Sequence, residues 1–331
     1  MIENVRKNWS NYFQIYVLAL IFFGIFFLYS KHDVGNDSSL SDWLINYEGG
    51  FVRRGLIGEI IINFSTALSF KLRDSILIFQ LFFFVSYYFL IILFCKNLFH
   101  NRIIILAIFS PIFVLYPVAE IEVLGRKELI IFLIFLSYLL FDIKSLKIQL
   151  IYKLILFPIS ILTWEPVFLF FPFIFLIDLF VFRINKFDKK FLYILLSYIV
   201  SIFFVTLIYL NPFPKENFSE MRDFLKNEFS EKCYMSCDFV GKQSANSFSE
   251  LFSMFLEKFK ITYALRYLII IIVGFFPLYL LSVFSKIKSK NQVLLISKFK
   301  NLFFPFLLAF LPSTILYLVM YDWARIDHIS Y

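Results

Sequence analysis

The chain has 331 residues, of which 60% are hydrophobic, and a formal net charge of +8 at pH 7. Soluble domains are nearer half apolar and do not carry several runs of about 20 apolar residues, so this composition predicts a helical protein that crosses a membrane many times. The positive charge lies mostly in lysines between apolar runs, where basic residues set membrane orientation and meet anionic headgroups. We therefore expect membrane lipids as partners, and not nucleic acid.

The first apolar run covers about residues 11–30 and follows two basic residues. It is too long for the apolar part of a secretion signal, and no small-residue cleavage site follows it, so we expect an uncleaved anchor. Asp33 and Asp37 come directly after this run, and Glu48 follows in the same loop. Each carboxylate is a candidate general base, or else a solvated loop residue.

Two adjacent arginines and four glycines stand in the next segment, N-Y-E-G-G-F-V-R-R-G-L-I-G, residues 46–58. Charge beside a membrane is costly and usually marks a pathway or a site. Gly49 and Gly50 predict a turn where backbone comes close to a bulky anion, and the guanidinium groups of Arg53 and Arg54 can clamp phosphate oxygens. The alternative is a loop whose arginines reach lipid phosphates and hold the segment at the surface.

Nine apolar runs predict nine spans, near residues 11–30, 75–95, 103–118, 129–141, 150–163, 166–182, 191–210, 262–284 and 301–320. A further run, residues 55–70, is interrupted by polar side chains and predicts either a tenth span or a helix at the membrane interface. The most basic short loops are 183–190 and 286–300, which the positive-inside rule places in the cytoplasm. This orientation puts the amino terminus inside and the carboxyl terminus outside, and it requires that residues 55–70 do not cross.

The expected fold class is therefore an all-α, polytopic transmembrane bundle. Residues 1–331 form a single integral-membrane domain, with an outer loop and interfacial helix at 31–74 and a larger outer loop at 211–261. On this orientation the acids and arginines singled out in these loops lie on the outer face. A reaction site built from several loops needs its groups on one side.

Five ionised residues stand in the loop that precedes the fourth run: Glu120, Glu122, Arg126, Lys127 and Glu128. Arg126 and Lys127 are candidates for phosphate binding, with Glu128 beside them. The loop is equally well explained as a solvated connection in which Glu122 and Arg126 form an i,i+4 ion pair.

The corner Trp164-Glu165-Pro166 divides two apolar runs that would otherwise merge. Proline breaks a helix, and Glu165 is the sole ionised residue between Lys153 and Asp178. A carboxylate in such apolar surroundings is expected to have a raised pKa, which suits proton transfer. The alternative is a turn residue wetted by headgroups.

Cys233 and Cys237 stand four residues apart in the large polar loop, close enough for a disulfide in an oxidising compartment. Only three histidines are present, so a zinc cluster is not expected. We expect no organic cofactor and leave a divalent metal ion open. After the last run, Asp322 and Arg325 bring an acid and a guanidinium to the outer interface, where the neighbouring aromatic residues are also typical of a membrane belt.

The stretch from Trp43 to Glu59 resembles a signature of polytopic proteins from bacterial capsule, exopolysaccharide and O-antigen gene clusters, in which G-G-F-x-R-R-G-L-x-G follows the first span. Residues 125–128 resemble their G-R-K-[DE] loop. Residues 164–166 are similar to their H-E-P corner, with Trp in place of His, and residues 322–325 resemble D-W-G-R, with Ala for Gly. One span, an outer loop with an interfacial helix, and then a bundle of spans also looks like the GT-C class of glycosyltransferases.

This resemblance implies an inner-membrane glycan-assembly enzyme, a polymerase or glycosyltransferase that takes sugars from an undecaprenyl phosphate or pyrophosphate carrier to build O-antigen, other lipopolysaccharide or capsule. The cationic residues would neutralise the leaving group: Arg53, Arg54, Arg126, Lys127 and Arg325. One carboxylate would accept the proton of the acceptor hydroxyl: Glu165, Asp33, Asp37 or Glu48. The alternatives are a flippase of the same glycan, which predicts ionised residues deep in several spans, and a non-catalytic subunit that binds other polysaccharide-assembly proteins.

Overall fold

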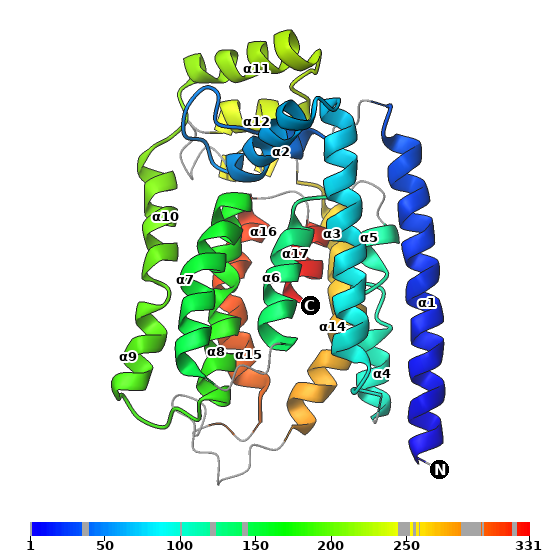
Figure 1. Cartoon of the computed structure of the whole chain (residues 1–331). Helices are drawn as coiled ribbons and strands as arrows, with labels where there is room; N and C mark the ends of the chain where they lie inside the picture. Colours follow the sequence, from blue (N-terminus) through cyan, green and yellow to red (C-terminus); the bar gives the residue numbers. More distant parts are fainter. Residues whose placement is uncertain are drawn as a thin grey trace.

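The computed structural model describes residues 2–34, 40–99, 101–119, 124–140, 145–243, 252–253, 256–257, 259–285, 299, 301–319 and 323–331. All regular secondary structure in these ranges is helical, which confirms the predicted all-α class. Most helices run along one axis, and a further set of helices lies across one end of the bundle (Figure 1).

The helices of the bundle are α1 (Ile2–Lys31), α3 (Leu72–Cys95), α4 (Arg102–Ile108), α5 (Tyr116–Ala119), α6 (Glu128–Leu140), α7 (Leu146–Thr163), α8 (Phe171–Val181), α9 (Lys189–Leu196), α10 (Ile199–Leu210), α14 (Ile261–Phe284), α15 (Phe303–Phe310), α16 (Leu316–Val319) and α17 (Trp323–Ser330). Single 3-10 turns are η1 (Ser41–Leu44), η2 (Glu165–Phe170) and η3 (Leu311–Ile315). The helices across the end are α2 (Gly55–Leu68), α11 (Lys215–Phe229) and α12 (Met235–Gln243).

Among the described residues, five helical segments are long and apolar enough to cross a membrane: Asn8–Lys31, Leu72–Cys95, Leu146–Thr163, Lys189–Leu210 and Ala264–Phe284. Three shorter apolar helices cover Gly55–Leu68, Glu128–Leu140 and Phe303–Leu318. Five of the nine predicted spans coincide with these full-length helices, and the count of nine is not confirmed. Large apolar side chains such as Phe22 and Phe203 are exposed on the flanks of the bundle, as expected of a surface that contacts lipid.

The run predicted as one span over residues 103–118 is divided in the structure. Helix α4 ends at Ile108, and a turn that contains Ser110 and Pro111 separates it from α5. Proline cannot donate a backbone hydrogen bond and ends the helix before it. A break at membrane depth is tolerated only where other parts of the protein satisfy the polar backbone groups.

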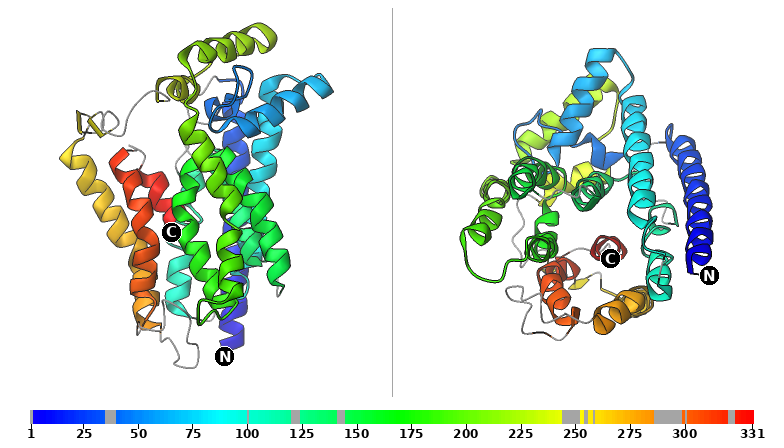
Figure 2. Two further views of the ribbon diagram at one scale, coloured as in Figure 1. Left: turned by 90° about the vertical axis from the view of Figure 1, so that its left-hand side faces the viewer. Right: turned by 60° about the horizontal axis from the view of Figure 1, so that its bottom comes forward.

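The last helix provides part of that satisfaction. In α17, the Nδ1 atom of His328 lies 2.7 Å from the carbonyl of Ile112, and the hydroxyl of Tyr331 donates to the carbonyl of Ala107 at 2.7 Å. The segment after residue 320, predicted as an outer tail, therefore turns back among the other helices, and its end lies in the middle of the bundle (Figure 2).

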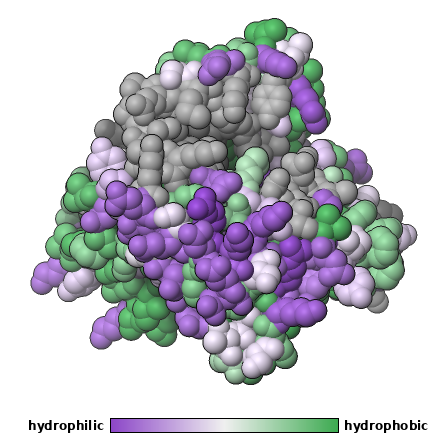
Figure 3. Space-filling view, turned by 90° about the horizontal axis from the view of Figure 1, so that it is seen from above, coloured by the Kyte–Doolittle hydropathy of each residue, from purple (hydrophilic) through white to green (hydrophobic). Residues whose placement is uncertain are grey.

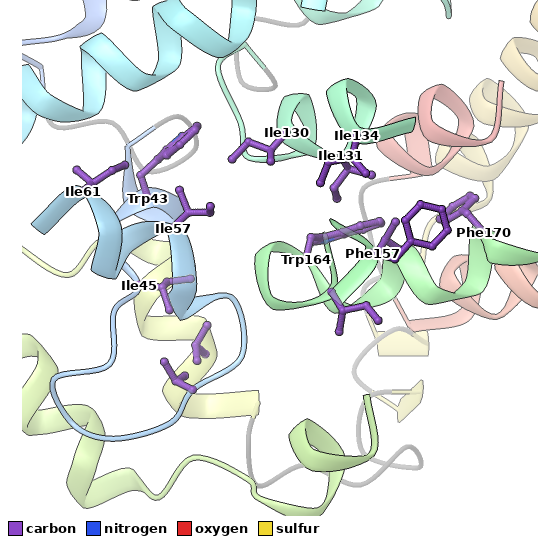
Figure 4. Close-up of a cluster of buried hydrophobic side chains, with 14 of the residues drawn as sticks. Trp43, Ile45, Ile57, Ile61, Ile130, Ile131, Ile134, Phe157, Trp164 and Phe170 are labelled. Carbon is purple, nitrogen blue, oxygen red and sulfur yellow. The ribbon is translucent and has the colours of Figure 1, made fainter. Parts of the chain in front are cut away.

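One hydrophobic core joins the end helices to the bundle. Trp43, Ile57 and Ile61 belong to η1 and α2, and they share a buried cluster with residues of α6, α7 and η2. Figure 4 shows Ile131 beside the large ring of Trp164 within this cluster. Because side chains from the end helices and from the bundle are buried in one cluster, the first half of α2 is held near the start of α6 and the end of α7.

Candidate functional site

A tight turn precedes α2 and places two arginines directly before the first residue of the helix. Gly50 has φ +108° and its N–H donates to the carbonyl of Tyr47 at 2.8 Å. Arg54, the residue before the helix, has φ +64°, in the left-handed region that residues other than glycine rarely adopt. The turn therefore directs Arg53 and Arg54 to the N-terminal end of α2.

Gly49 makes its close backbone approach to another part of the protein. A Cβ atom at Gly49 would lie 2.1 Å from the carbonyl oxygen of Asn217 in α11, and the Asn217 side chain donates to the carbonyl of Gly49 at 2.5 Å. The close backbone approach at Gly49 is thus made to α11, which covers the turn, and not to an open anion site.

Arg54 and Glu165 form a bidentate ion pair. The Nε and Nη2 atoms of Arg54 each lie 2.8 Å from a different oxygen of Glu165, and Nη1 of Arg53 lies 3.5 Å from the same carboxylate. The three side chains are between 14% and 21% exposed, so water still reaches part of this ion-pair cluster. A bidentate guanidinium–carboxylate pair fixes the relative orientation of the two side chains as well as their separation.

The predicted raised pKa of Glu165 is wrong. Burial by itself raises the pKa of this carboxyl, but the charges and hydrogen bonds of Arg54, together with the charge of Arg53, outweigh burial and lower the pKa to about 2. The apolar neighbours in sequence are not its neighbours in space. At neutral pH Glu165 is a fixed anion that positions the arginines, and it is a poor proton acceptor.

Lys127 contacts the backbone of the same arginine. Its side chain is completely buried, and Nζ donates to the backbone carbonyl of Arg54 at 2.7 Å. Burial lowers the pKa of Lys127 to about 8; the charge of Arg54 adds to this shift, and the charges of Asp42 and Glu165 oppose it. Lys127 is therefore a positioning residue for the unusual backbone of Arg54.

The loop that carries Lys127 is itself held in place. Gly125 has φ +73°, and its carbonyl accepts hydrogen bonds from Trp43 Nε1 at 2.7 Å and from Gln80 Nε2 at 3.1 Å. A Cβ atom at this position would also lie 2.7 Å from the side chain of Leu28. The segments around residues 43, 54 and 127 are thus connected directly, although they are far apart in sequence.

Asp42 is a member of this cluster that the sequence did not single out as a site residue. Its side chain is 5% exposed, and its negative charge raises the pKa of both Arg54 and Lys127. The feature of the sequence that could have identified Asp42 is its position beside Trp43, where the resemblance to the surface-polysaccharide proteins begins. Its carboxylate balances part of the positive charge at the start of α2.

The remaining candidates in the described part of the chain lie near the start of α6, in the turn before α2 and in α17. Arg126 is half-buried and Glu128 is buried in the first turn of α6, where the positive end of the helix dipole favours an acid. Glu48 is exposed in the turn before α2. Arg325 lies in α17, and its side chain is outside the described part of the chain, as are residues Asp37 and Asp322.

Asp33 does not join the arginines. It lines a cavity together with Ser69 and Phe70, at the C-terminal end of α2, whereas Arg53 and Arg54 lie at its N-terminal end. At a rise of about 1.5 Å per residue, a helix of this length separates the two places by roughly 20 Å. The predicted convergence of Asp33 with the arginines is therefore not found.

Cys233 and Cys237 are joined by a disulfide at the start of α12, in the segment that links α11 and α12 over this end of the bundle. No group of three or more His, Cys, Asp or Glu residues is arranged to hold a metal ion within the described ranges. The cluster itself combines two guanidinium groups and an ammonium group with two carboxylates. Its chemistry is that of an anion site with a preset geometry.

A different ion pair is buried within the bundle. Nζ of Lys153 lies 2.6 Å from Asp178, which also accepts hydrogen bonds from the hydroxyls of Tyr138 and Tyr198. Both charged side chains are completely buried. The pair explains how an acid is accommodated in α8, because its partner and two hydroxyls replace water.

No protein-family profile, no curated protein and no solved structure matches the chain.

Proposed function

We propose that this protein assembles a bacterial surface glycan at the outer face of the inner membrane, as a polymerase or glycosyltransferase that binds an undecaprenyl-(pyro)phosphate-linked sugar. The observation that carries the proposal is the meeting of Arg53, Arg54 and Lys127 at the N-terminal end of α2 beside Glu165. The resemblance of residues 43–59 supplies the class of substrate.

Electrostatics favour an anion here. The positive end of the α2 dipole adds to the charges of the arginines, and such a helix end is suited to phosphate. Arg53 is 3.5 Å from Glu165, while Arg54 is bound at 2.8 Å. In the proposed complex, Arg53 binds the phosphate oxygens and Arg54 stabilises the charge that develops on the leaving group.

The arrangement of the helices fits a lipid-linked substrate. Hydrophilic residues gather on the face that carries α2 and α11 (Figure 3), and apolar helices extend away from it. The carrier chain would lie along those helices while its phosphate reaches the start of α2. Nine crossings with a cytoplasmic amino terminus would place this face outside the cell.

The acceptor needs a proton acceptor other than Glu165. Glu48 is exposed in the same turn as the arginines, which makes it the carboxylate that we assign to this role. Asp33 is excluded from it because α2 separates it from the arginines.

The proposal is tested by a double variant, Arg53→Ala with Arg54→Ala, produced in a strain that lacks the native gene. We expect long surface glycan to disappear while the amount of protein in the membrane is unchanged. Arg222→Ala is the matched control, because Arg222 is exposed on α11 and pairs with Asp223. A normal length ladder of surface glycan from the double variant would contradict the proposal.

A flippase is the second candidate, and the Lys153–Asp178 pair is the observation that favours it, because transporters carry ionised groups inside the bundle. Deletion of the gene separates the two functions. A polymerase predicts short glycan chains on the outer face, and a flippase predicts lipid-linked precursor retained on the inner face.

A further inference from the structure

A separate cavity of about 590 Å³ opens at the opposite end of α2 from the arginines. Its walls come from the end of α1, the turn between α2 and α3, and the end of α11. Its volume lies within the range of about 300–1,000 Å³ that is usual for small-molecule sites. The cavity therefore has room for a ligand of its own.

The back wall is a fixed polar network. Arg73 contacts both oxygens of Glu231, at 2.5 and 3.0 Å, and it also donates to the hydroxyl of Tyr234 and to the carbonyl of Asp33. Glu231 is buried, so this ion pair ties the first turn of α3 to the segment after α11. With its donors engaged in this way, Arg73 is a structural part of the wall and does not present an anion site.

The charge left to line the cavity is mainly negative. Besides Lys71, the lining contains three carboxylates, those of Asp33, Asp74 and Glu228. His32 lies between two of them, 3.1 Å from Asp33 and 2.8 Å from Asp74. This balance disfavours a phosphate or an anionic lipid headgroup. It suits a ligand that donates hydrogen bonds, because each carboxylate oxygen accepts several.

Apolar rings complete the lining. Phe70 is 46% exposed at the cavity, and Phe229 lies in the wall contributed by α11. Carboxylates that accept hydroxyl or amine hydrogens, combined with exposed aromatic faces, match a molecule with polar edges and an apolar face. Neutral sugars and amino sugars have this construction.

We infer that this cavity binds neutral or amino sugar residues of the growing glycan, as a saccharide subsite distinct from the phosphate site. Only the assignment of that glycan as the acceptor depends on the proposed function; the binding of sugar does not. The separation of roughly 20 Å along α2 means that one oligosaccharide, and not one sugar, would reach from this cavity to Arg53.

Binding is measured on the purified full chain with the variant Ser69→Cys, which places a thiol on the cavity wall. The native cysteines leave it as the reactive one, because Cys95 is buried and the other two form the disulfide. Maltotetraose and chitotetraose are the probes. We expect at least one to slow maleimide labelling, about tenfold at nine times Kd, because labelling follows the empty fraction 1/(1 + [L]/Kd).

The second variant, Glu228→Gln, removes a cavity carboxylate that is exposed, and we expect it to raise the half-protecting concentration about tenfold. Asp223→Asn, on the exposed surface of α11, should leave it unchanged. Labelling that neither saccharide slows, or that spermidine or inorganic phosphate slows as well as they do, would overturn the inference. Protection that persists in the Arg53→Ala, Arg54→Ala background separates this site from the phosphate site.

Discussion

Glu165 shows how the partners of a residue decide its chemistry. Its carboxylate sits after a long apolar helix, yet the contacts that matter come from two guanidinium groups more than a hundred positions earlier in the chain. They lower its pKa to about 2, despite burial. We therefore assign Glu165 to the orientation of Arg53 and Arg54, and not to proton transfer.

This assignment predicts a specific loss of stability in acid. The folded pKa of Glu165 lies below its ordinary value of 4.5, so its stabilising effect is complete above about pH 4.5 and is lost as the pH falls towards 2. The loss is on the order of 3 kcal/mol of unfolding free energy. About 2 kcal/mol of this loss is reached by pH 3, so tryptophan fluorescence during thermal unfolding in detergent, compared at pH 7 and at pH 3, measures most of it.

Glu165→Gln should lower the melting temperature at pH 7, because two partly buried guanidinium groups lose their counter-charge, and should show a smaller further drop at pH 3. Glu220→Gln, at an exposed position on α11, should behave like the unchanged protein. If Glu165→Gln and the unchanged protein fall equally between pH 7 and pH 3, the ion pair does not stabilise the fold.

At the scale of elements, α2 depends on small residues that face the segment before it. A Cβ atom at Gly58 would lie 1.9 Å from the carbonyl oxygen of Ile45, and one at Gly55 would lie 2.4 Å from the ring of Tyr47. The backbone N–H of Tyr47 also donates to Glu59 on the same helix at 3.2 Å. The helix and the preceding turn are therefore packed backbone to backbone, which sets where the arginines lie.

Gly58→Ala tests this packing without changing any charge. Because a backbone carbonyl cannot move aside cheaply, we expect the variant to lose about 1–3 kcal/mol of stability and to reduce long surface glycan. Ile60→Ala, at an exposed position of the same helix, is the control and should change both little. A Gly58→Ala protein that melts and functions normally would show that the contact has room to relax.

At the scale of the whole molecule, the hydrophilic elements gather at one end, although they come from separate parts of the chain. The turn before α2, the loop before α6, the corner after α7 and the helices α11 and α12 all lie there. The loop between α8 and α9 lies at the opposite end, beyond the apolar helices (Figure 1). A membrane around those helices would separate the two ends.

Thiol labelling in intact cells tests this arrangement. Ser69→Cys, at the end of α2, should react with a membrane-impermeant maleimide added outside, and Phe187→Cys, exposed in the loop between α8 and α9, should react only after the membrane is opened. Labelling of the two positions in the reverse order would invert the proposed orientation and place the proposed glycan site inside the cell.

Non-reducing mass spectrometry of native membranes should also find Cys233 joined to Cys237.

The sequence by itself determined the helical class and many of the helices. The runs predicted near 75–95 and 262–284 are helices Leu72–Cys95 and Ile261–Phe284, and the polar-interrupted segment 55–70 is the helix Gly55–Leu68 that lies across the end of the bundle. These features follow from local apolar content and period, which each segment carries in itself. The stretch around Arg53 and Arg54 was likewise visible, because charge among apolar residues is conspicuous.

Only the tertiary structure decided which of the conspicuous residues belong together. It joined Arg54 to Glu165 and Lys127, added Asp42, and placed Asp33 in a cavity at the opposite end of α2. It also divided the run at 103–118, where His328 and Tyr331 at the end of the chain contact two backbone carbonyls. The physical reason is the same in each case: an ion pair or a hydrogen bond between distant segments depends on how helices pack, and packing is a property of the whole chain that no local window contains.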